Sequence, residues 1–264
     1  MRINVHAGHA KDGNAFAGAD GGSIGVRESV EDRKIKDSII KYLRADGHTV
    51  YDCTVDSGSS ATDILKKICA KCNANKVDID LSIHLNAYQK SSKDGKIKGT
   101  ECWCYSTSST TAKTIATRIC KNISALGFTN RGVKFNSNYY VLRNTNSQAI
   151  IVETLFCDDE DDVLQYKKIG ADAIGKAIAE AVVNKKISTA SAGSAAGGTF
   201  IVRIIADELN VRSGAGLDYK VNQVVKKGEA FTIVDVKGAD GITWGKLKSG
   251  AGWISLNSKY VTRI

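Results

Sequence analysis

A run of eleven small, uncharged residues, STASAGSAAGG (residues 188–198), divides the chain into two parts with different hydrophobic patterns. The run has almost nothing to bury, and such a composition is typical of a flexible linker. The part before it is long enough for a large domain, and the 66 residues after it are enough for a small one. We therefore predict a domain over 1–187, a linker over 188–198 and a second domain over 199–264.

Strand-like and helix-like stretches alternate before this run. They read RINVHAG, ESVEDRKIKDSIIKYLRADG, TVYDCTV, ATDILKKICAKCNAN, VDIDLSIHLNA, KGTECWCYS, TTAKTIATRICKNISALG, AIIVETLF and DEDDVLQYKKIGADAIGKAIAEAVVNKK. The alternation predicts an α/β domain, with a mostly parallel twisted sheet flanked by helices. After the run, short strands broken by glycine, such as ELNVRSGAG and AGWISLN, predict a small all-β barrel.

The composition is that of an ordinary globular protein, with 42% hydrophobic and 25% charged residues. No apolar run approaches the ~20 residues of a membrane span, so we predict no membrane insertion. The start, MRINVHAG, lacks the basic head and apolar stretch of a secretory signal. We expect a protein made in the cytoplasm without a signal peptide, which acts outside the cell only after release by another route.

The formal net charge of +9 favours a polyanionic partner. The excess is spread along the chain, however, and no basic stripe interleaved with aromatic residues indicates nucleic-acid binding. An anionic surface such as a cell wall fits a diffuse excess equally well. We predict no nucleic-acid partner, and the sequence leaves the oligomeric state undetermined.

Seven cysteines are an odd number in a chain without an export signal, so we expect reduced, buried thiols. One alternative is a four-cysteine zinc site. It would join Cys69 and Cys72, on a predicted helix, to Cys102 and Cys104, on a predicted strand. Helix and strand positions lack the turns that zinc knuckles use, which favours the structural interpretation.

Four polar residues fall where the carboxyl ends of parallel strands would place chemistry. His9 follows the first strand, Glu28 opens the first long helix, and His84 lies near the end of DIDLSIHLNA. Two imidazoles and one carboxylate are a ligand set of catalytic zinc. Glu153, inside the apolar strand AIIVETLF, is costly to bury unless it is paired or functional. The alternatives are structural: a hydrogen-bonded histidine, and a glutamate that complements a helix dipole.

The segments NVHAGH, GVRES, LSIHLNA and AIIVETLF, in this order, resemble the four blocks of the zinc-dependent N-acetylmuramoyl-L-alanine amidases of the type-3 amidase family. The resemblance covers about residues 1–185. It places His9, Glu28 and His84 on the zinc ligands and Glu153 on the catalytic glutamate. His6 stands where the family usually has aspartate, so His6 competes with His9 for the ligand role. We favour His9, with His6 supporting it.

This resemblance implies a peptidoglycan hydrolase with Zn²⁺ as cofactor. Zinc would activate water, Glu153 would transfer its proton, and the amide between N-acetylmuramic acid and L-alanine of the stem peptide would be cleaved. A zinc peptidase cutting within the stem peptide would use the same ligands. A non-catalytic wall-binding protein is the other alternative.

Residues 199–264, with the core LNVRSG, resemble a bacterial SH3 domain of the kind that tethers lytic enzymes to peptidoglycan. Tyr219, Trp244, Trp253 and Tyr260 are candidates for wall contact. Each would serve equally well in the core of a small barrel, so we assign no wall-binding residue. The two resemblances together imply a wall hydrolase with a wall-binding module, and the lack of a signal sequence favours a phage endolysin-like protein.

Overall fold

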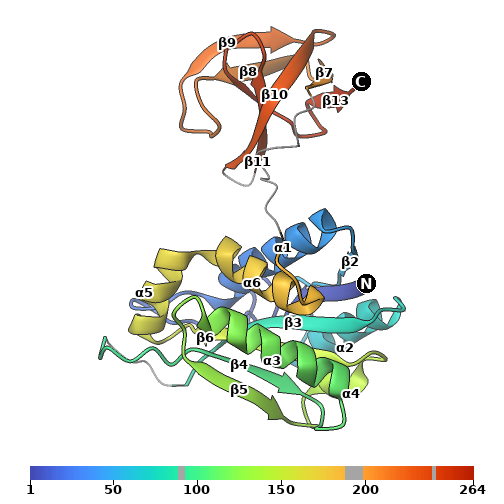
Figure 1. Ribbon diagram of the computed structural model, residues 1–264, viewed down its shortest axis with the longest axis vertical. Coiled ribbons are helices and arrows are strands. Elements are labelled where there is room, and N and C mark those ends of the chain that lie inside the picture. The colour runs from blue at the N-terminus through green and yellow to red at the C-terminus, as the bar shows by residue number, and fades with distance from the viewer. Residues whose placement is uncertain (89–92, 188–198, 240–241) are drawn as a thin grey trace. The chain divides into compact units, whose positions relative to one another are not determined.

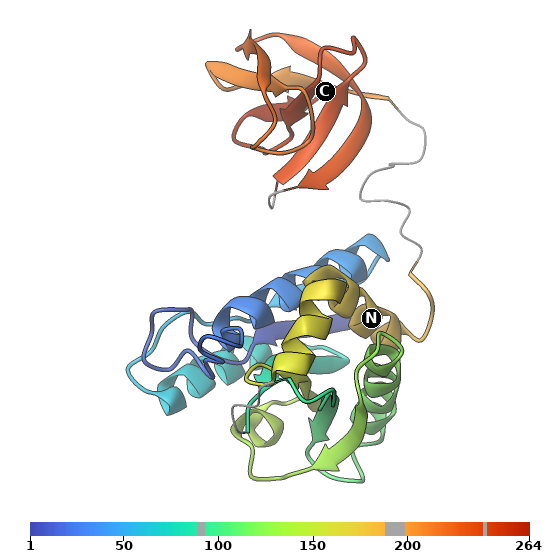
Figure 2. The same ribbon diagram turned by 90° about the vertical axis from the view of Figure 1, so that its left-hand side faces the viewer.

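The computed structural model describes residues 1–88, 93–187, 199–239 and 242–264 (Figures 1 and 2). The chain forms two compact units, with the division after Ile187. The predicted linker, 188–198, lies outside the described residues.

The first unit contains a six-stranded sheet in the order β2-β1-β3-β6-β4-β5. Its strands are β1 (Arg2–Ala7), β2 (Thr49–Asp52), β3 (Ile79–Asn86), β4 (Thr100–Cys104), β5 (Asn130–Phe135) and β6 (Ala149–Phe156). Strands β2, β1, β3 and β6 are parallel, which confirms the predicted α/β fold with a mostly parallel sheet. Strand β4 runs antiparallel to β6 and parallel to β5, so the last two strands have the opposite direction.

Helices cover both faces of this sheet (Figure 1). On one face α6 (Ala171–Val183) packs against both α1 (Glu28–Ala45) and α3 (Thr110–Ser124). Helix α5 (Glu160–Ile169) contacts β6 and α6. On the other face α2 (Ala61–Asn73) packs against α4 (Tyr140–Asn144).

Local chemistry accounts for several of the helix ends. Helix α2 begins after Ser60, whose side chain accepts a hydrogen bond from the Asp63 backbone N–H at 3.0 Å. The predicted C-terminal helix is two helices, α5 and α6, because Gly170 between them has a φ of 81° and breaks the helical path. Strand β5 and the short helix α4 were absent from the sequence prediction, since neither has a long periodic pattern.

The two faces of the sheet have separate apolar cores. Cys102 and Cys104 belong to the core beneath α1, α3 and α6, whereas Cys69 and Cys72 belong to the core beneath α2. The sheet therefore separates the two pairs, and among the described residues no cysteine belongs to a group able to hold a metal. The four-cysteine zinc alternative is wrong for this reason. All seven cysteines are free and buried, as predicted.

The second unit is a seven-stranded antiparallel sheet in the order β13-β7-β10-β11-β12-β8-β9. Its strands are β7 (Phe200–Ile204), β8 (Glu208–Arg212), β9 (Val221–Lys226), β10 (Ala230–Ala239), β11 (Ile242–Leu247), β12 (Trp253–Ser255) and β13 (Val261–Arg263). The all-β prediction is confirmed. Strand β9 was missed, because VNQVVK is mostly exposed and lacks a clear apolar alternation.

Among the described helices, none combines the length and the apolar character that crossing a membrane requires.

Candidate metal centre

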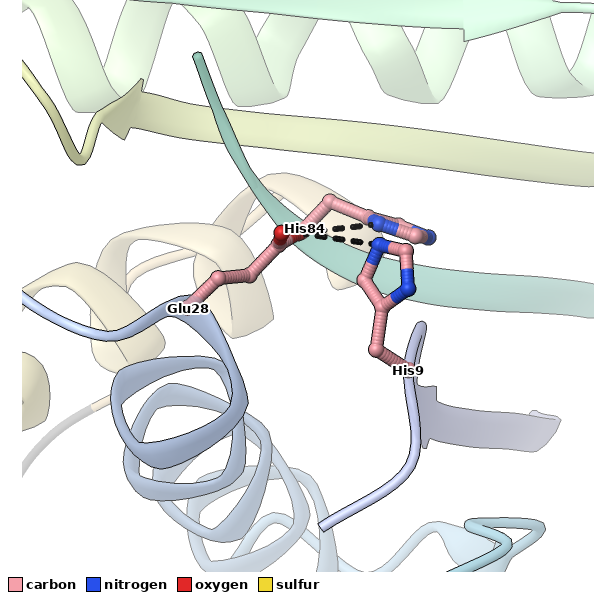
Figure 3. A group of neighbouring side chains, drawn as sticks. All are labelled: His9, Glu28 and His84. Atoms are coloured by element: carbon pink, nitrogen blue, oxygen red, sulfur yellow. Dashed lines mark hydrogen bonds and ion pairs between the residues drawn. The ribbon is translucent and has the colours of Figure 1, made fainter. Parts of the chain in front are cut away.

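His9, Glu28 and His84 converge at the carboxyl edge of the sheet, each from a different element (Figure 3). His9 follows β1, Glu28 is the first residue of α1, and His84 lies near the end of β3. One ligand atom from each residue lies within 4.8 Å of the others. Glu28 Oε1 is 3.1 Å from His84 Nδ1 and 3.4 Å from His9 Nε2. The structure thus brings together the three predicted ligands.

Backbone amides hold the Glu28 carboxylate in place. The N–H of Leu85 donates to Oε1 at 3.0 Å, and the N–H of Ala19 donates to Oε2 at 2.8 Å. Glu28 is 3% exposed. Because β3 and the loop before α1 each supply one donor, the carboxylate orientation is set before any ligand arrives.

Two glycines allow the close approach of the imidazole rings. A Cβ on Gly8 would lie 1.9 Å from the His84 ring. A Cβ on Gly18 would lie 2.5 Å from Glu28 Oε2 and 2.7 Å from the His9 ring, and Gly18 also has a φ of +81°. Any side chain at either position would displace the predicted ligands.

Ser82 orients His84 from within the same strand. Its Oγ lies 3.0 Å from His84 Nε2, and Ser82 is fully buried. Nδ1 of His84 faces Glu28, and with Nδ1 bound to a metal the Nε2–H would donate to Ser82. Such a contact fixes the tautomer and ring plane of a metal-binding histidine.

Glu153 lies beside this group. It pairs with His84 in the register of β6 against β3, so both side chains project from the same face. Its Oε2 is buried and has no hydrogen-bond partner among the described residues. Burial, and then the nearby charges of Glu28 and Glu101, raise the pKa of Glu153 well above its ordinary value. A buried carboxylate of this kind is a functional-site candidate.

For each of the three predicted ligands, burial and the contacts with Glu28 or with the histidines shift the pKa in opposite directions. Burial alone would raise the pKa of Glu28, but its contacts with His84 and His9 outweigh it and lower this pKa. For His9, the hydrogen bond and charge of Glu28 overcome burial and raise the pKa. For His84, burial dominates and lowers the pKa, which favours the neutral imidazole that binds metals.

A cavity of about 290 Å³ opens onto the group. His9, His84 and Glu153 form its polar part. The apolar part comes from the loop after β1 and from α2, α4 and β6, and consists of Phe16, Ala61, Ile64, Leu65, Tyr139, Tyr140, Val141 and Ile151. An uncharged group bound there would be shielded from water next to the candidate ligands.

His6 is not part of the group. It is fully buried, and its Nδ1 lies 3.1 Å from the Ala7 carbonyl. No residue that the structure describes makes a hydrogen bond to its Nε2. In the described part of the chain His6 makes no hydrogen bond to His9. No such contact therefore supports the predicted role of His6 in positioning His9. Burial lowers the pKa of His6 to about 4.

Sequence reasoning missed Glu101, which lies opposite Glu153 in the register of β4 against β6. The Glu101 carboxylate is 3% exposed and accepts from Arg131 Nε at 2.6 Å and Lys134 Nζ at 2.7 Å. It also accepts from Trp103 Nε1 at 3.1 Å and Asn86 Nδ2 at 3.2 Å. The segment TECWC could have indicated Glu101, because the alternation of side chains along a strand places Glu101 and Trp103 on one face of the sheet.

The candidate wall-contact aromatics of the second unit fall into two groups. Trp244 and Trp253 are 2% and 8% exposed and belong to the interior, whereas Tyr219 and Tyr260 are 52% and 41% exposed. Trp244 and Tyr260 also line a cavity of about 420 Å³.

The fold and the group of His9, Glu28 and His84 define a class of α/β proteins that carry a candidate metal centre at the carboxyl edge of a mainly parallel sheet. The chain belongs to the N-acetylmuramoyl-L-alanine amidase family, whose sequence profile matches residues 3–184. The profile of the bacterial SH3 domain matches residues 207–262.

Individual relatives agree with this assignment. The chain is 38% identical over 189 residues to an uncharacterised protein of Clostridium perfringens, covering 71% of this chain and 53% of that protein. It is 35% identical over 212 residues to the endolysin of Bacillus phage SPP1, covering 73% of this chain and 74% of the endolysin. The chain therefore spans about half the length of the Clostridium perfringens relative and most of the phage protein.

A solved structure shows the same fold. The catalytic domain of the CD27L endolysin, described as targeting Clostridia difficile, superposes with a TM-score of 0.61 at 28% identity. The match covers 71% of this chain and 99% of that domain.

Proposed function

We propose that this protein is a peptidoglycan hydrolase that cleaves the amide between N-acetylmuramic acid and L-alanine. In this proposal residues 1–187 are the catalytic domain, 188–198 a linker, and 199–264 a wall-binding domain. The observation that supports it most strongly is the convergence of His9, Glu28 and His84 within 4.8 Å, at the mouth of a cavity that also contains Glu153. Family membership over residues 3–184 supports the reaction class.

The residues present fit a zinc ion. Two imidazoles and one carboxylate are a common ligand set of catalytic zinc, and the carboxylate is already oriented by two backbone amides. The glycines at positions 8 and 18 leave the rings unobstructed. Zinc held by His9, Glu28 and His84 would supply Lewis acidity, lowering the pKa of a water to about 7 and polarising an amide carbonyl.

The rest of the mechanism belongs to the chain itself. Glu153 accepts the proton of the attacking water and delivers it to the leaving amine of L-alanine. Its raised pKa favours the first step, because a carboxyl group in an apolar wall takes up a proton more readily than one in water. The apolar lining of the cavity excludes bulk water from the reacting amide.

The second unit would hold the enzyme on its substrate. Binding of one domain to the wall raises the effective concentration of the amide bond for the other. The match of residues 207–262 to the bacterial SH3 domain supports this role. In this proposal the protein acts at the cell wall after release from the cell that makes it.

Metal analysis and product analysis test the proposal together. We expect about one zinc per chain, lysis of cell walls that chelation abolishes and zinc restores, and new amino termini only at L-alanine. New termini within the stem peptide would instead identify a peptidase. Wall binding without any bond cleavage would identify a binding protein.

A further inference from the structure

A row of charged residues runs across the sheet from the candidate metal centre toward its edge. His84 on β3 pairs with Glu153 on β6, and Glu153 pairs with Glu101 on β4. The side chains of paired residues project from one face of a sheet, so this row lies on the face that bears the cavity. Beyond Glu101, the last strand β5 contributes Arg131 and Lys134.

This basic pair carries an excess of positive charge. Arg131 and Lys134 share one buried carboxylate, that of Glu101, at 2.6 and 2.7 Å. Their side chains remain 35% and 36% exposed. Two cations paired with one carboxylate leave one unit of positive charge that faces solvent. The buried Glu101 carboxylate holds the guanidinium of Arg131 and the ammonium of Lys134 in place.

Aromatic rings connect the basic pair to the cavity. Lys134 Nζ lies 5.2 Å from the centre of the Trp103 ring, and Trp103 meets Tyr139 edge-on at 5.3 Å between ring centres. Tyr139 lines the cavity. The surface from Tyr139 through Trp103 to Lys134 is therefore continuous with the space next to Glu153.

We propose that Arg131 and Lys134 bind a free carboxylate on the second residue of the stem peptide, one residue beyond the alanine whose amide is cleaved. This inference rests on the proposed function. It predicts the orientation of the bound substrate, in which the stem peptide extends from Glu153 toward β5.

Both the distance from Glu153 and the positive charge of Arg131 and Lys134 favour a carboxylate on the second residue of the stem peptide. Glu101 lies one strand from Glu153, neighbouring strands are about 4.8 Å apart, and the side chains of Arg131 and Lys134 contact the Glu101 carboxylate. An extended peptide advances about 3.3 Å per residue, so two residues span this gap. On the glycan side of the amide the lactyl carboxyl is consumed in the bond, which leaves acetamido and hydroxyl groups without charge. The peptide side is where an anion can occur.

The test uses zinc-loaded full-length protein and two muramyl tripeptides that differ only in whether the second-residue carboxylate is free or amidated. We expect kcat/KM to be at least about tenfold higher for the free carboxylate, mainly through KM. Lys134→Gln should abolish this preference, so that the two substrates are hydrolysed with equal kcat/KM. Lys134→Arg should retain the preference. Lys113→Gln, an exposed position on α3, is the matched control and should behave like the wild type.

Lys134→Gln is the appropriate variant because Arg131 still pairs with the buried Glu101 and the fold is preserved. Equal kcat/KM for the two substrates, or an unchanged preference in Lys134→Gln, would overturn the inference and leave the proposed function intact. Absence of hydrolysis of both substrates would refute the proposed function. In that case calorimetric binding of the two free tripeptides decides the inference, and equal Kd values would overturn it.

Discussion

His84 and Glu153 are paired residues on the neighbouring parallel strands β3 and β6. The pairing sets a candidate ligand and a candidate base side by side on one face of the sheet, although 69 positions separate them in the sequence. Neither residue depends on a flexible loop for its place. The sheet therefore fixes the position of the candidate base, Glu153, relative to the candidate ligand, His84.

Glu153→Gln should lower the rate of wall hydrolysis by about 10²- to 10⁴-fold, because the amide keeps the shape of the side chain but cannot carry the proton. Binding to walls should persist, as measured by cosedimentation. Asp37→Asn is the matched control, since this carboxylate is 70% exposed and does not line the cavity, and the activity of this variant should equal that of the wild type. Comparable activity in Glu153→Gln would remove this residue from the mechanism.

Glu153→Gln should also change how the stability of the metal-free protein depends on pH. The folded-state pKa of Glu153 is raised, so the folded chain holds its proton more tightly than the unfolded chain. The metal-free protein should therefore lose stability from this group as the pH rises above about 4.5, and Glu153→Gln should not. Urea unfolding with chelator should show the variant to be the more stable form at neutral pH. A variant less stable than the wild type there contradicts the shift.

Gly8→Ala should reduce zinc content and activity, because the added methyl group would lie 1.9 Å from the His84 ring and force it to move. Gly238→Ala is the matched control: a Cβ there meets nothing within 4 Å, and we expect a stability change within about 0.5 kcal/mol. Zinc content by elemental analysis, together with lysis rates, compares the two. Full zinc occupancy in Gly8→Ala would show that the ring tolerates displacement.

Ser82→Ala should weaken zinc affinity by about 10- to 100-fold, because His84 would lose the hydrogen bond that orients it. Competition with a chromogenic chelator measures this affinity. Ser108→Ala, at an exposed serine, serves as the control and should leave the Kd unchanged. An unaltered Kd in Ser82→Ala would mean that Gly8 and Glu28 suffice to hold the ring.

His6 should make the metal-free protein sensitive to mild acid. Burial lowers its pKa from 6.5 to about 4, so the unfolded chain binds this proton more readily than the folded chain. The stability that His6 contributes is complete above pH 6.5 and is lost as the pH falls toward 4. The loss is about 3 kcal/mol. Urea unfolding across this range should show a shallower pH dependence in His6→Gln than in the wild type, and parallel curves would contradict the assignment.

Several features of the protein could be predicted from the sequence because local chemistry determines them. Alternating strands and helices predicted the fold class, and positions at strand ends made His9, Glu28, His84 and Glu153 candidates. The resemblance of four blocks to the type-3 amidases then implied their roles. A carboxylate in an apolar strand is unusual wherever that strand lies, so Glu153 could be identified without knowledge of its neighbours.

Other features depended on which strands are neighbours. The antiparallel direction of β4, the register that aligns Glu101 with Glu153, and the isolation of His6 from His9 have no local signature. The sequence determined which side chains were available for chemistry, because residue type and periodicity are properties of short segments. Only the tertiary structure decided which of them meet, because strand order and register arise from packing between segments that are far apart in the chain.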